Sequence, residues 1–138
     1  MRKIVLYIAM SLDGYIADKN GGIDWLNGQE ENASLPDTYS RFIRNVDTVK
    51  IQFTAQDPCI LAKRLRKEPG KNIWICGGAD IVRQLMRENL IDVYHICIIP
   101  VILGDGIRLF NQTANHINLK LTDNLTYNGI TELVYERR

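Results

Sequence analysis

The sequence lacks an excess of charge of either sign, a long apolar run and an even number of cysteines. Its 17 basic and 16 acidic residues leave a net charge of +1, which gives no electrostatic reason to expect nucleic acid or a membrane as a partner. No apolar run approaches the ~20 residues that a membrane-spanning helix needs. The first residues do not resemble a signal peptide, so we expect a cytoplasmic protein.

Groupings of residues that bind metals are also missing. The three cysteines, Cys59, Cys76 and Cys97, each lie in or beside an apolar run, which predicts buried, reduced thiols and neither disulfides nor a metal site. The two histidines, His95 and His116, lack the spacing of metal ligands. We expect His95 to be a strand residue with an ordinary hydrogen-bond partner and His116 to lie at the surface.

The 138 residues do contain the strand and helix patterns of one α/β domain. The predicted sheet is mixed and mainly parallel, is flanked by helices and has an antiparallel C-terminal edge. Helices are expected to begin at Pro36-Asp37-Thr38 and at Asp57-Pro58, with each aspartate as the cap. The last strand has mixed polarity, which favours an edge position. Strands are predicted at residues 4–10, 47–54, 73–76, 93–101, 119–127 and 130–137, and a turn at Asn128-Gly129 is predicted to join the last two.

The stretch from Asn72 to Gly106 is the most informative part of the chain. It has the pattern of a buried strand, the pair Gly77-Gly78, an amphipathic helix and a second strand. A glycine pair between a strand and a helix lets the backbone approach a ligand, and the first N–H groups of the helix favour a phosphate. Two glycines there also suit a plain tight turn, and Asp80 in the first helical turn would repel a phosphate. The pattern therefore leaves a nucleotide site and a simple turn as alternatives.

The segment from Asp47 to Thr54 does not fit the rest of the pattern. It contains no turn residue and has the character of one strand between two helices. The expected topology is then short of one strand and one crossover helix. Either the protein is a shortened variant of its fold, or residues are missing near Val49 and Lys50. We favour the second interpretation.

Three motifs, taken together, resemble those of one protein family. They are I-A-M-S-L-D-G-Y-I-A at residues 8–17, the Gly77-Gly78 turn with its helix, and I-P-V-I-L-G-D-G at residues 99–106. In this order they resemble the dihydrofolate reductase superfamily, in particular the reductase domain of bacterial riboflavin biosynthesis (RibD C-terminal domain). The resemblance covers nearly the whole chain. It implies a single domain of that fold over residues 1–138, with NADPH bound at the carboxyl ends of the strands.

The resemblance also implies roles for individual residues. Backbone groups of Ala9 and Ile16 would hold the nicotinamide carboxamide. Substrate contacts are expected from Ser11, Gly14 and Trp25. The cofactor-binding residues implied at the start of the glycine-initiated helix are Cys76, Gly77, Gly78, Ala79 and Ile81.

Two aspartates are candidates for the catalytic residues. Asp13 lies where reductases of the riboflavin type hold their substrate, although an aspartate before a glycine also suits an ordinary turn. Asp37 belongs to Leu35-Pro36-Asp37, which with Phe42 resembles the helix that carries the active-site carboxylate of folate reductases. Its alternative role is a helix cap. For Trp25, a lid over the substrate is favoured over a surface anchor for its loop.

The function implied by the resemblance is hydride transfer from NADPH to a small heterocyclic or ribosylamino-pyrimidine substrate, as in 5-amino-6-(5-phosphoribosylamino)uracil reductases. The cofactor carries that chemistry, so no catalytic triad or metal is required. The main departure is the absence of the Gly-Arg-x-Thr turn that grips the cofactor phosphates in the family. The alternative is therefore a non-catalytic nucleotide-binding or interaction module that retains the fold. We also expect a homodimer, formed through the C-terminal edge strand and the apolar run from Ile96 to Leu103.

Overall fold

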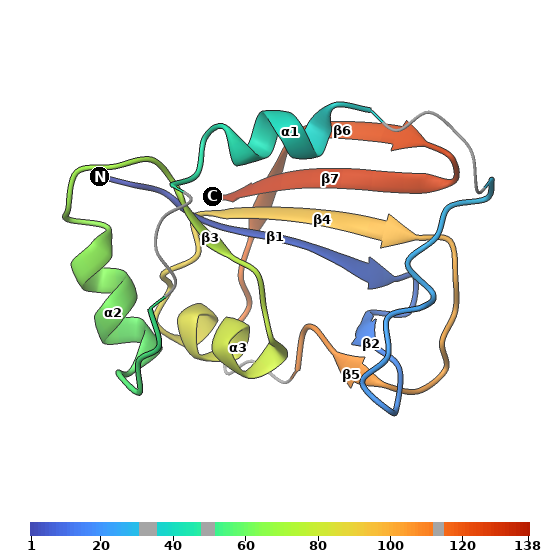
Figure 1. Cartoon of the computed structure of the whole chain (residues 1–138), viewed down its shortest axis with the longest axis horizontal. Helices are drawn as coiled ribbons and strands as arrows, with labels where there is room; N and C mark the ends of the chain where they lie inside the picture. Colours follow the sequence, from blue (N-terminus) through green and yellow to red (C-terminus); the bar gives the residue numbers. More distant parts are fainter. Residues whose placement is uncertain (31–35, 48–51, 112–114) are drawn as a thin grey trace.

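The computed structural model describes residues 1–30, 36–47, 52–111 and 115–138. Within these ranges a five-stranded sheet carries three helices, and two short strands form a second sheet beside it (Figure 1). No helix in the described chain is long and apolar enough to cross a membrane. The elements in chain order are β1 (Ile4–Ser11), β2 (Tyr15–Ala17), α1 (Thr38–Ile43), α2 (Pro58–Leu65), β3 (Ile73–Ile75), α3 (Ala79–Arg87), β4 (Val93–Ile99), β5 (Ile107–Arg108), β6 (Leu119–Tyr127) and β7 (Ile130–Arg137).

The main sheet has the strand order β3-β1-β4-β7-β6. Strand β1 pairs in parallel with β3 and β4, whereas the β4–β7 and β7–β6 pairings are antiparallel. The predicted mixed sheet with an antiparallel C-terminal part is therefore confirmed. The prediction that the sheet is mainly parallel is wrong, because the two antiparallel pairings together involve more residues than the two parallel ones. The β6–β7 hairpin turns at Asn128 and Gly129, as predicted. Both residues have positive φ angles, 47° and 74°, which is the conformation of tight turns that match the twist of the strands.

The face of the sheet toward α2 and α3 holds the hydrophobic core. Side chains alternate along a strand, so Ile4 and Leu6 of β1 share this face with Tyr94 and Ile96 of β4. All four are buried, and apolar side chains of the two helices cover them. The helix residues of this core are Cys59, Ala62, Val82, Leu85 and Met86.

The opposite face of the sheet is covered by α1 (Figure 1). Aromatic rings attach this helix to the sheet. No residue of α1 is fully buried, so the short helix depends on these contacts. The rings of Tyr7 and Phe42 stack with their centroids 4.3 Å apart, and the Trp74 ring meets Phe42 edge-on at 5.3 Å. Trp74 also donates from Nε1 to the Tyr7 carbonyl oxygen at 3.0 Å. Aromatic packing of this kind contributes beyond simple area burial.

The two predicted aspartate caps have different outcomes. Asp57 caps α2 as predicted, because its carboxylate accepts hydrogen bonds from the N–H groups of Cys59 and Ile60 at 2.8 and 3.0 Å. Helix α1 begins at Thr38 as predicted, but the Asp37 side chain makes no capping hydrogen bond. The backbone at Asp37 is not extended, with φ −78° and ψ 28°, whereas a capping side chain normally needs extended backbone. The predicted cap at Asp37 is therefore wrong.

The predicted edge position of the last strand is also wrong. Strand β7 lies between β4 and β6, so β6 is the exposed edge of the described sheet. The mixed polarity of β7 has another cause, because Glu132 is only 1% exposed and bonds to His95 within the sheet face. A polar residue in an interior strand is accommodated when a neighbouring strand supplies its partner.

Strand β3 was predicted to be covered on both faces, but it is half-buried and forms the other edge of the described sheet. Cys76, which follows it, is exposed, contrary to the prediction of a buried thiol. Beyond β3, Val46 forms an isolated parallel bridge with Asn72. The described residues 47 and 52–54 form no strand, so the strand predicted there is wrong for that part. The suspected gap near Val49 and Lys50 lies outside the described residues.

Helix α3 provides a test of how the core stabilises the fold. Leu85 is 1% exposed, whereas Ile81 of the same helix is 40% exposed. We expect Leu85→Ala to lower the free energy of unfolding by about 2–5 kcal/mol, because it removes buried contacts and leaves a cavity. The control Ile81→Ala should cost less than about 1 kcal/mol. Urea unfolding of both variants measures the difference, and equal losses would contradict this assignment of the core.

Candidate functional site

A cavity of about 340 Å³ lies where β1 and β3 end. Five residues that the sequence predicted for cofactor binding line it together, although they come from three separate segments. Ala79 and Ile81, the other two, belong to α3 and do not line this cavity. The lining residues are Ala9, Ile16, Cys76, Gly77 and Gly78, with Ile8, Ile23 and Leu26.

The two glycines differ in how much space surrounds them. Gly77 has a φ of +124°, a backbone conformation that other residues rarely adopt, and the peptide bond to Gly78 is cis. A Cβ atom at Gly77 would lie 3.4 Å from the Ile8 Cδ1 atom, whereas one at Gly78 would meet nothing within 4 Å. Gly78 has an ordinary φ of −85°. Open space therefore adjoins the backbone of Gly78, as close approach of a ligand requires.

The start of α3 adjoins the same glycines. Gly78 is the N-cap residue of this helix, and no side chain caps it. The sequence suggested that Asp80 would repel a phosphate, but its side chain bonds to residues of its own helix. Its carboxylate accepts hydrogen bonds from Arg83 and, at 2.9 Å, from the Gln84 side chain. The charge of Asp80 is thus paired with Arg83, which weakens the objection to an anion at this helix start.

Asp13 ties together two loops at this end of the sheet. Its Oδ1 accepts from the Ser11 hydroxyl at 2.6 Å and from the Leu103 N–H at 3.1 Å, and its Oδ2 accepts from the Gly104 N–H at 2.8 Å. The hydrogen bond from Ser11, followed by those from the two backbone groups, lowers the pKa of Asp13 to about 2. A carboxylate that stays ionised and holds two loops is suited to positioning them, not to exchanging a proton at neutral pH.

Two of the predicted substrate residues are part of this same connection. Ser11 is fully buried, and its hydroxyl also accepts a hydrogen bond from the Tyr15 N–H at 2.9 Å. It has no surface left for a ligand, so the predicted substrate contact does not fit this geometry. Gly14, with a φ of +93°, forms the turn between β1 and β2, and its carbonyl oxygen accepts from the Leu109 N–H at 3.0 Å.

The loop that contains Trp25 lies against the cavity, but Trp25 itself anchors the loop. Its Nε1 donates to the Gly22 carbonyl oxygen at 3.0 Å, and the side chain is half-buried. The cavity is lined instead by its neighbours Ile23 and Leu26. The far end of the loop is held by the Asn128 turn, whose carbonyl oxygen accepts from the Gln29 N–H at 2.9 Å. This geometry favours the anchor over the predicted lid.

Asp37 lies outside both this cavity and the polar face of the sheet. Its side chain is 66% exposed and forms a surface ion pair with Arg44 at 3.1 Å. Leu35, the first residue of the motif that suggested a catalytic role, lies outside the described residues. Phe42, the last residue of that motif, does face the sheet. Helix α1 thus covers the face of the sheet that Phe42 contacts, but the Asp37 side chain does not reach that face.

The functional candidate that the sequence reasoning missed is Glu132 of β7. One of its oxygens, Oε1, lies 2.8 Å from the His95 Nε2 atom and 3.4 Å from both the Cys97 sulfur and the Tyr7 hydroxyl. A carboxylate oxygen only accepts, so the His95 Nε2 atom carries the proton. The other oxygen, Oε2, is buried and has no hydrogen-bond partner among the described residues. A pattern could have revealed this site, because Glu132 lies between the apolar residues Ile130 and Val134 on one face of β7.

The titration behaviour of this group follows from its burial. Burial raises the pKa of Glu132, but the neighbouring polar groups of His95, Tyr127 and Cys97 outweigh it, so the pKa is lowered overall. Burial, then the charge of Glu132, raises the pKa of Cys97 to about 12. Burial is also the main cause that raises the pKa of Tyr7 above its usual range. Glu132 is therefore an ionised carboxylate among hydrogen-bond donors. Donor atoms of His95, Cys97 and Glu132 lie within 4.8 Å of one another, a grouping that could also hold a metal ion.

A cavity of about 420 Å³ lies over this group, between α1 and the antiparallel strands. Its floor includes His95 and Glu132, and Phe42 of α1 forms part of its wall. The register places the floor beside the first cavity. Ala9 of β1 pairs with Cys97 of β4, which pairs with Glu132 of β7, so these side chains share one face of the sheet.

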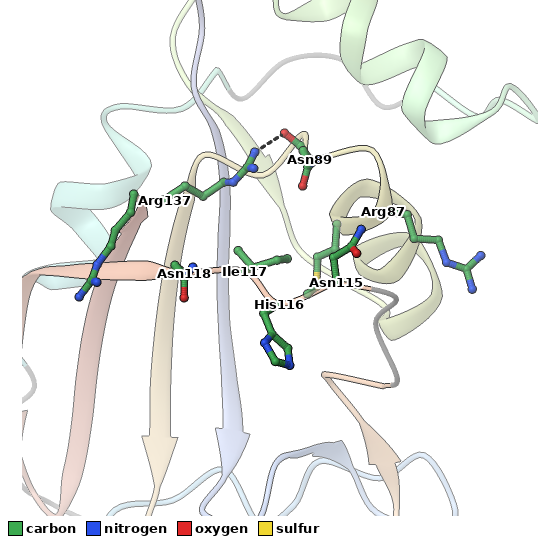
Figure 2. A pocket seen from close by; sticks show the side chains of 9 residues that line it. Arg87, Asn89, Asn115, His116, Ile117, Asn118 and Arg137 are labelled. Carbon is green, nitrogen blue, oxygen red and sulfur yellow. Dashed lines mark hydrogen bonds between the residues drawn. The ribbon is translucent and has the colours of Figure 1, made fainter.

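A different cavity, of about 500 Å³, lies at the opposite end of the sheet (Figure 2). It lies between the end of α3 and the start of β6, and Arg137 crosses it to donate to the Asn89 carbonyl oxygen at 2.8 Å. Arg87, Arg138 and His116 are exposed there, as predicted for His116. None of the predicted site residues lines this cavity, so it is separate from the candidate site.

The chain is similar to proteins of one family. The family model described as the RibD C-terminal domain matches residues 44–133. The uncharacterized protein YwjB of Bacillus subtilis is 34% identical to the chain, over 99% of this chain and 98% of its own length.

Two solved structures have the same fold. A protein of Shewanella sp. PV-4, named for riboflavin biosynthesis, matches with a TM-score of 0.78 at 19% identity, over 97% of this chain and 98% of that one. The diaminohydroxyphosphoribosylaminopyrimidine deaminase/5-amino-6-(5-phosphoribosylamino)uracil reductase of Thermotoga maritima matches with a TM-score of 0.71 at 11% identity. That match covers 99% of this chain and 57% of the longer protein.

The alignment with the Bacillus relative also bears on the length of the chain. It runs over 176 positions, whereas this chain has 138 residues, so at least 38 positions (176 less 138) have no counterpart here. A shortage of that size is consistent with a missing strand and crossover helix. It also agrees with the isolated bridge at Val46, which lies where a further strand beside β3 would begin.

The connection made by Asp13 gives a test by pH. Its pKa of about 2 lies below the ~3.9 of an unfolded aspartate. The ionised group therefore stabilises the fold above about pH 4, and this contribution is lost as the pH falls toward about 2. We expect wild type to lose more stability than Asp13→Asn over that range in urea unfolding experiments. The exposed Asp24→Asn should follow wild type, and parallel curves for wild type and Asp13→Asn would contradict the role of Asp13.

Proposed function

The chain belongs to the RibD C-terminal domain family, and from that premise we propose that it is an NADPH-dependent reductase acting on a small heterocyclic substrate, of the ribosylamino-pyrimidine type. The observation that carries the proposal is the cavity beside Gly78. Ala9, Ile16, Cys76 and Gly77, which the family resemblance assigned to the cofactor, come together there with open space at the Gly78 backbone.

The residues present fit the nicotinamide end of NADPH. A flat ring needs a shallow apolar cavity with backbone polar groups at its border, and Ile8, Ile23 and Leu26 supply the apolar walls. Backbone groups of Ala9 and Ile16 would orient the carboxamide. The start of α3, where no side chain caps the helix and Arg83 pairs with Asp80, would favour the first phosphate groups.

The chain's own contribution to the reaction is positioning and exclusion of water. NADPH supplies a hydride when it is bound. Asp13 fixes the loop after β1 against the loop after β4, so the walls of the cavity keep their spacing. The apolar side chains of Ile23 and Leu26 line the cavity, and exclusion of water around a bound ring would strengthen the electrostatic contacts inside it.

A second candidate function is a binding module that retains the fold without catalysis. The observation that favours it is the shortage of at least 38 positions relative to YwjB, together with the absence of a Gly-Arg-x-Thr turn. Without that turn, the cofactor phosphates lose part of their binding site. Nucleotide titration separates the two functions.

We further propose a cytoplasmic homodimer. Three free cysteines suit a reducing compartment. We place the dimer surface on β6 and not, as the sequence predicted, on the last strand, because β6 forms the free edge of the described sheet. Strand β6 is exposed along most of its length. An unpaired edge strand can extend its sheet onto a second copy. In the apolar run from Ile96 to Leu103, Ile102 is 70% exposed and is therefore available for contact with a second copy. Size-exclusion chromatography with light scattering should give twice the chain mass, and a monomer at micromolar concentration would reject the dimer.

NADPH titration of purified protein tests the proposed function. We expect saturable binding that raises the melting temperature, with NADH measured in parallel. Gly78→Ala should weaken NADPH binding by about tenfold or more, because the added methyl group enters the open space of the cavity. The variant should fold, since its φ is ordinary and its Cβ meets no neighbour.

The control for this titration is Ser40→Thr, which adds one methyl group on the exposed side of α1. It should bind NADPH like wild type. Failure of folded wild type to bind either nucleotide at millimolar concentration would instead support the non-catalytic module. Equal binding by wild type and Gly78→Ala would remove the cavity as the cofactor site.

A further inference from the structure

Glu132 has one oxygen saturated with donors and one oxygen with none. Three donors, from His95, Cys97 and Tyr7, converge on Oε1. Oε2 is buried and accepts no hydrogen bond from the described residues. A buried acceptor that lacks a donor is destabilising, and more so when it is charged. The site is therefore complete only when a ligand or a water molecule donates to Oε2.

The space beside Glu132 is of the size and character of a ligand site. The cavity of about 420 Å³ has Glu132 and His95 in its floor and the Phe42 ring in its wall. Phe42 is itself held by stacking on Tyr7. An aromatic side chain beside a carboxylate suits a planar heterocycle that carries amino or ring N–H groups.

Glu132 also lies on the same face of the sheet as a residue of the cofactor cavity. Ala9 lines that cavity and pairs with Cys97 on the neighbouring strand, and Cys97 pairs with Glu132 on the next strand. The three side chains lie on the same face of the sheet. Two strand spacings amount to about 10 Å. A ring bound at Glu132 would therefore extend toward the cavity beside Ala9, which is the arrangement that a hydride acceptor requires.

We propose that Glu132 is the acidic residue of the substrate site and that its Oε2 accepts a hydrogen bond from an N–H group of an aminopyrimidine-like substrate. His95 is the positioning residue, because its bond to Oε1 fixes the carboxylate. Strand β7 thus supplies the acidic group that the family resemblance assigned to Asp37, which lies at the surface, paired with Arg44. The choice of substrate class rests on the proposed function, whereas the donor-accepting site rests on the geometry of Glu132.

The probe for the test is 2,4-diaminopyrimidine, which carries N–H donors. Its comparison is 2,4-dimethoxypyrimidine, which has the same ring and no donor. The chain has two histidines, His95 in the site and His116 at the opposite end of the sheet, so imidazole NMR signals report the site with an internal control. In wild type, with and without NADPH, we expect the diamino probe to shift the His95 signal saturably and to leave His116 unchanged. The dimethoxy compound should bind at least about tenfold more weakly.

Two variants locate the effect on Glu132. Glu132→Gln keeps the size of the side chain but removes its charge and should weaken the diamino probe by at least about tenfold. Asp37→Asn makes the same chemical change on the surface of the domain and should bind the probe like wild type. Circular dichroism and melting temperature establish that both variants fold. If Glu132→Gln does not fold, the contrast between the two pyrimidines in wild type still decides the question.

Several outcomes would overturn the inference. These are equal binding of the two pyrimidines, no shift of His95, unchanged affinity in Glu132→Gln, or a loss in Asp37→Asn as large as in Glu132→Gln. A His95 shift with Zn²⁺ and none with the probe would identify His95, Cys97 and Glu132 as a metal site instead. NADPH binding is measured separately, so its absence together with probe binding at Glu132 would reject the reductase and retain the substrate-type site.

Discussion

The register between β1, β4 and β7 is the constraint on which the rest of the structure depends. Side chains alternate along a strand, so fixing one pair fixes the face of every other residue. The pairing of Tyr7 with His95 and of Cys97 with Glu132 sends these polar and aromatic groups to the α1 face. The same register sends Ile4, Leu6 and their neighbours to the core under α2 and α3. A shift of one residue would exchange the two faces.

This division gives the domain a structural side and a chemical side. The core face is uniformly apolar and can be packed tightly by two helices. The α1 face carries a buried carboxylate, an imidazole and a thiol, and a short helix covers it through aromatic contacts. Such a cover leaves room for ligand-sized cavities, and the connection through Asp13 keeps the neighbouring loops in place. The candidate site thus lies on the face that is covered by a helix without a fully buried residue.

Much of the fold could be predicted because its signals are local. The apolar run from residue 4, the Asp57-Pro58 helix start and the Asn128-Gly129 turn each act over a few residues and are all confirmed. The errors about which strands are edges have one origin, which is that burial depends on distant neighbours. Strand β7 has the polarity of an edge but is interior, because His95 on another strand satisfies Glu132. Strand β3 has the apolar character of an interior strand but is an edge, because no strand forms beside it in the described residues.

The sequence by itself determined the mixed α/β domain, its hairpin and helix starts, and a group of cofactor candidates around Gly77 that the fold brings into one cavity. It could do so because periodicity, turn residues and motif order are written along the chain. Only the tertiary structure decided which carboxylate faces the site. Asp37 and Glu132 are 95 positions apart in sequence, and neither is exceptional in its own segment. Backbone geometry turned Asp37 outward to Arg44, and strand register buried Glu132 against His95, since a side chain's environment is set by the elements that pack around it.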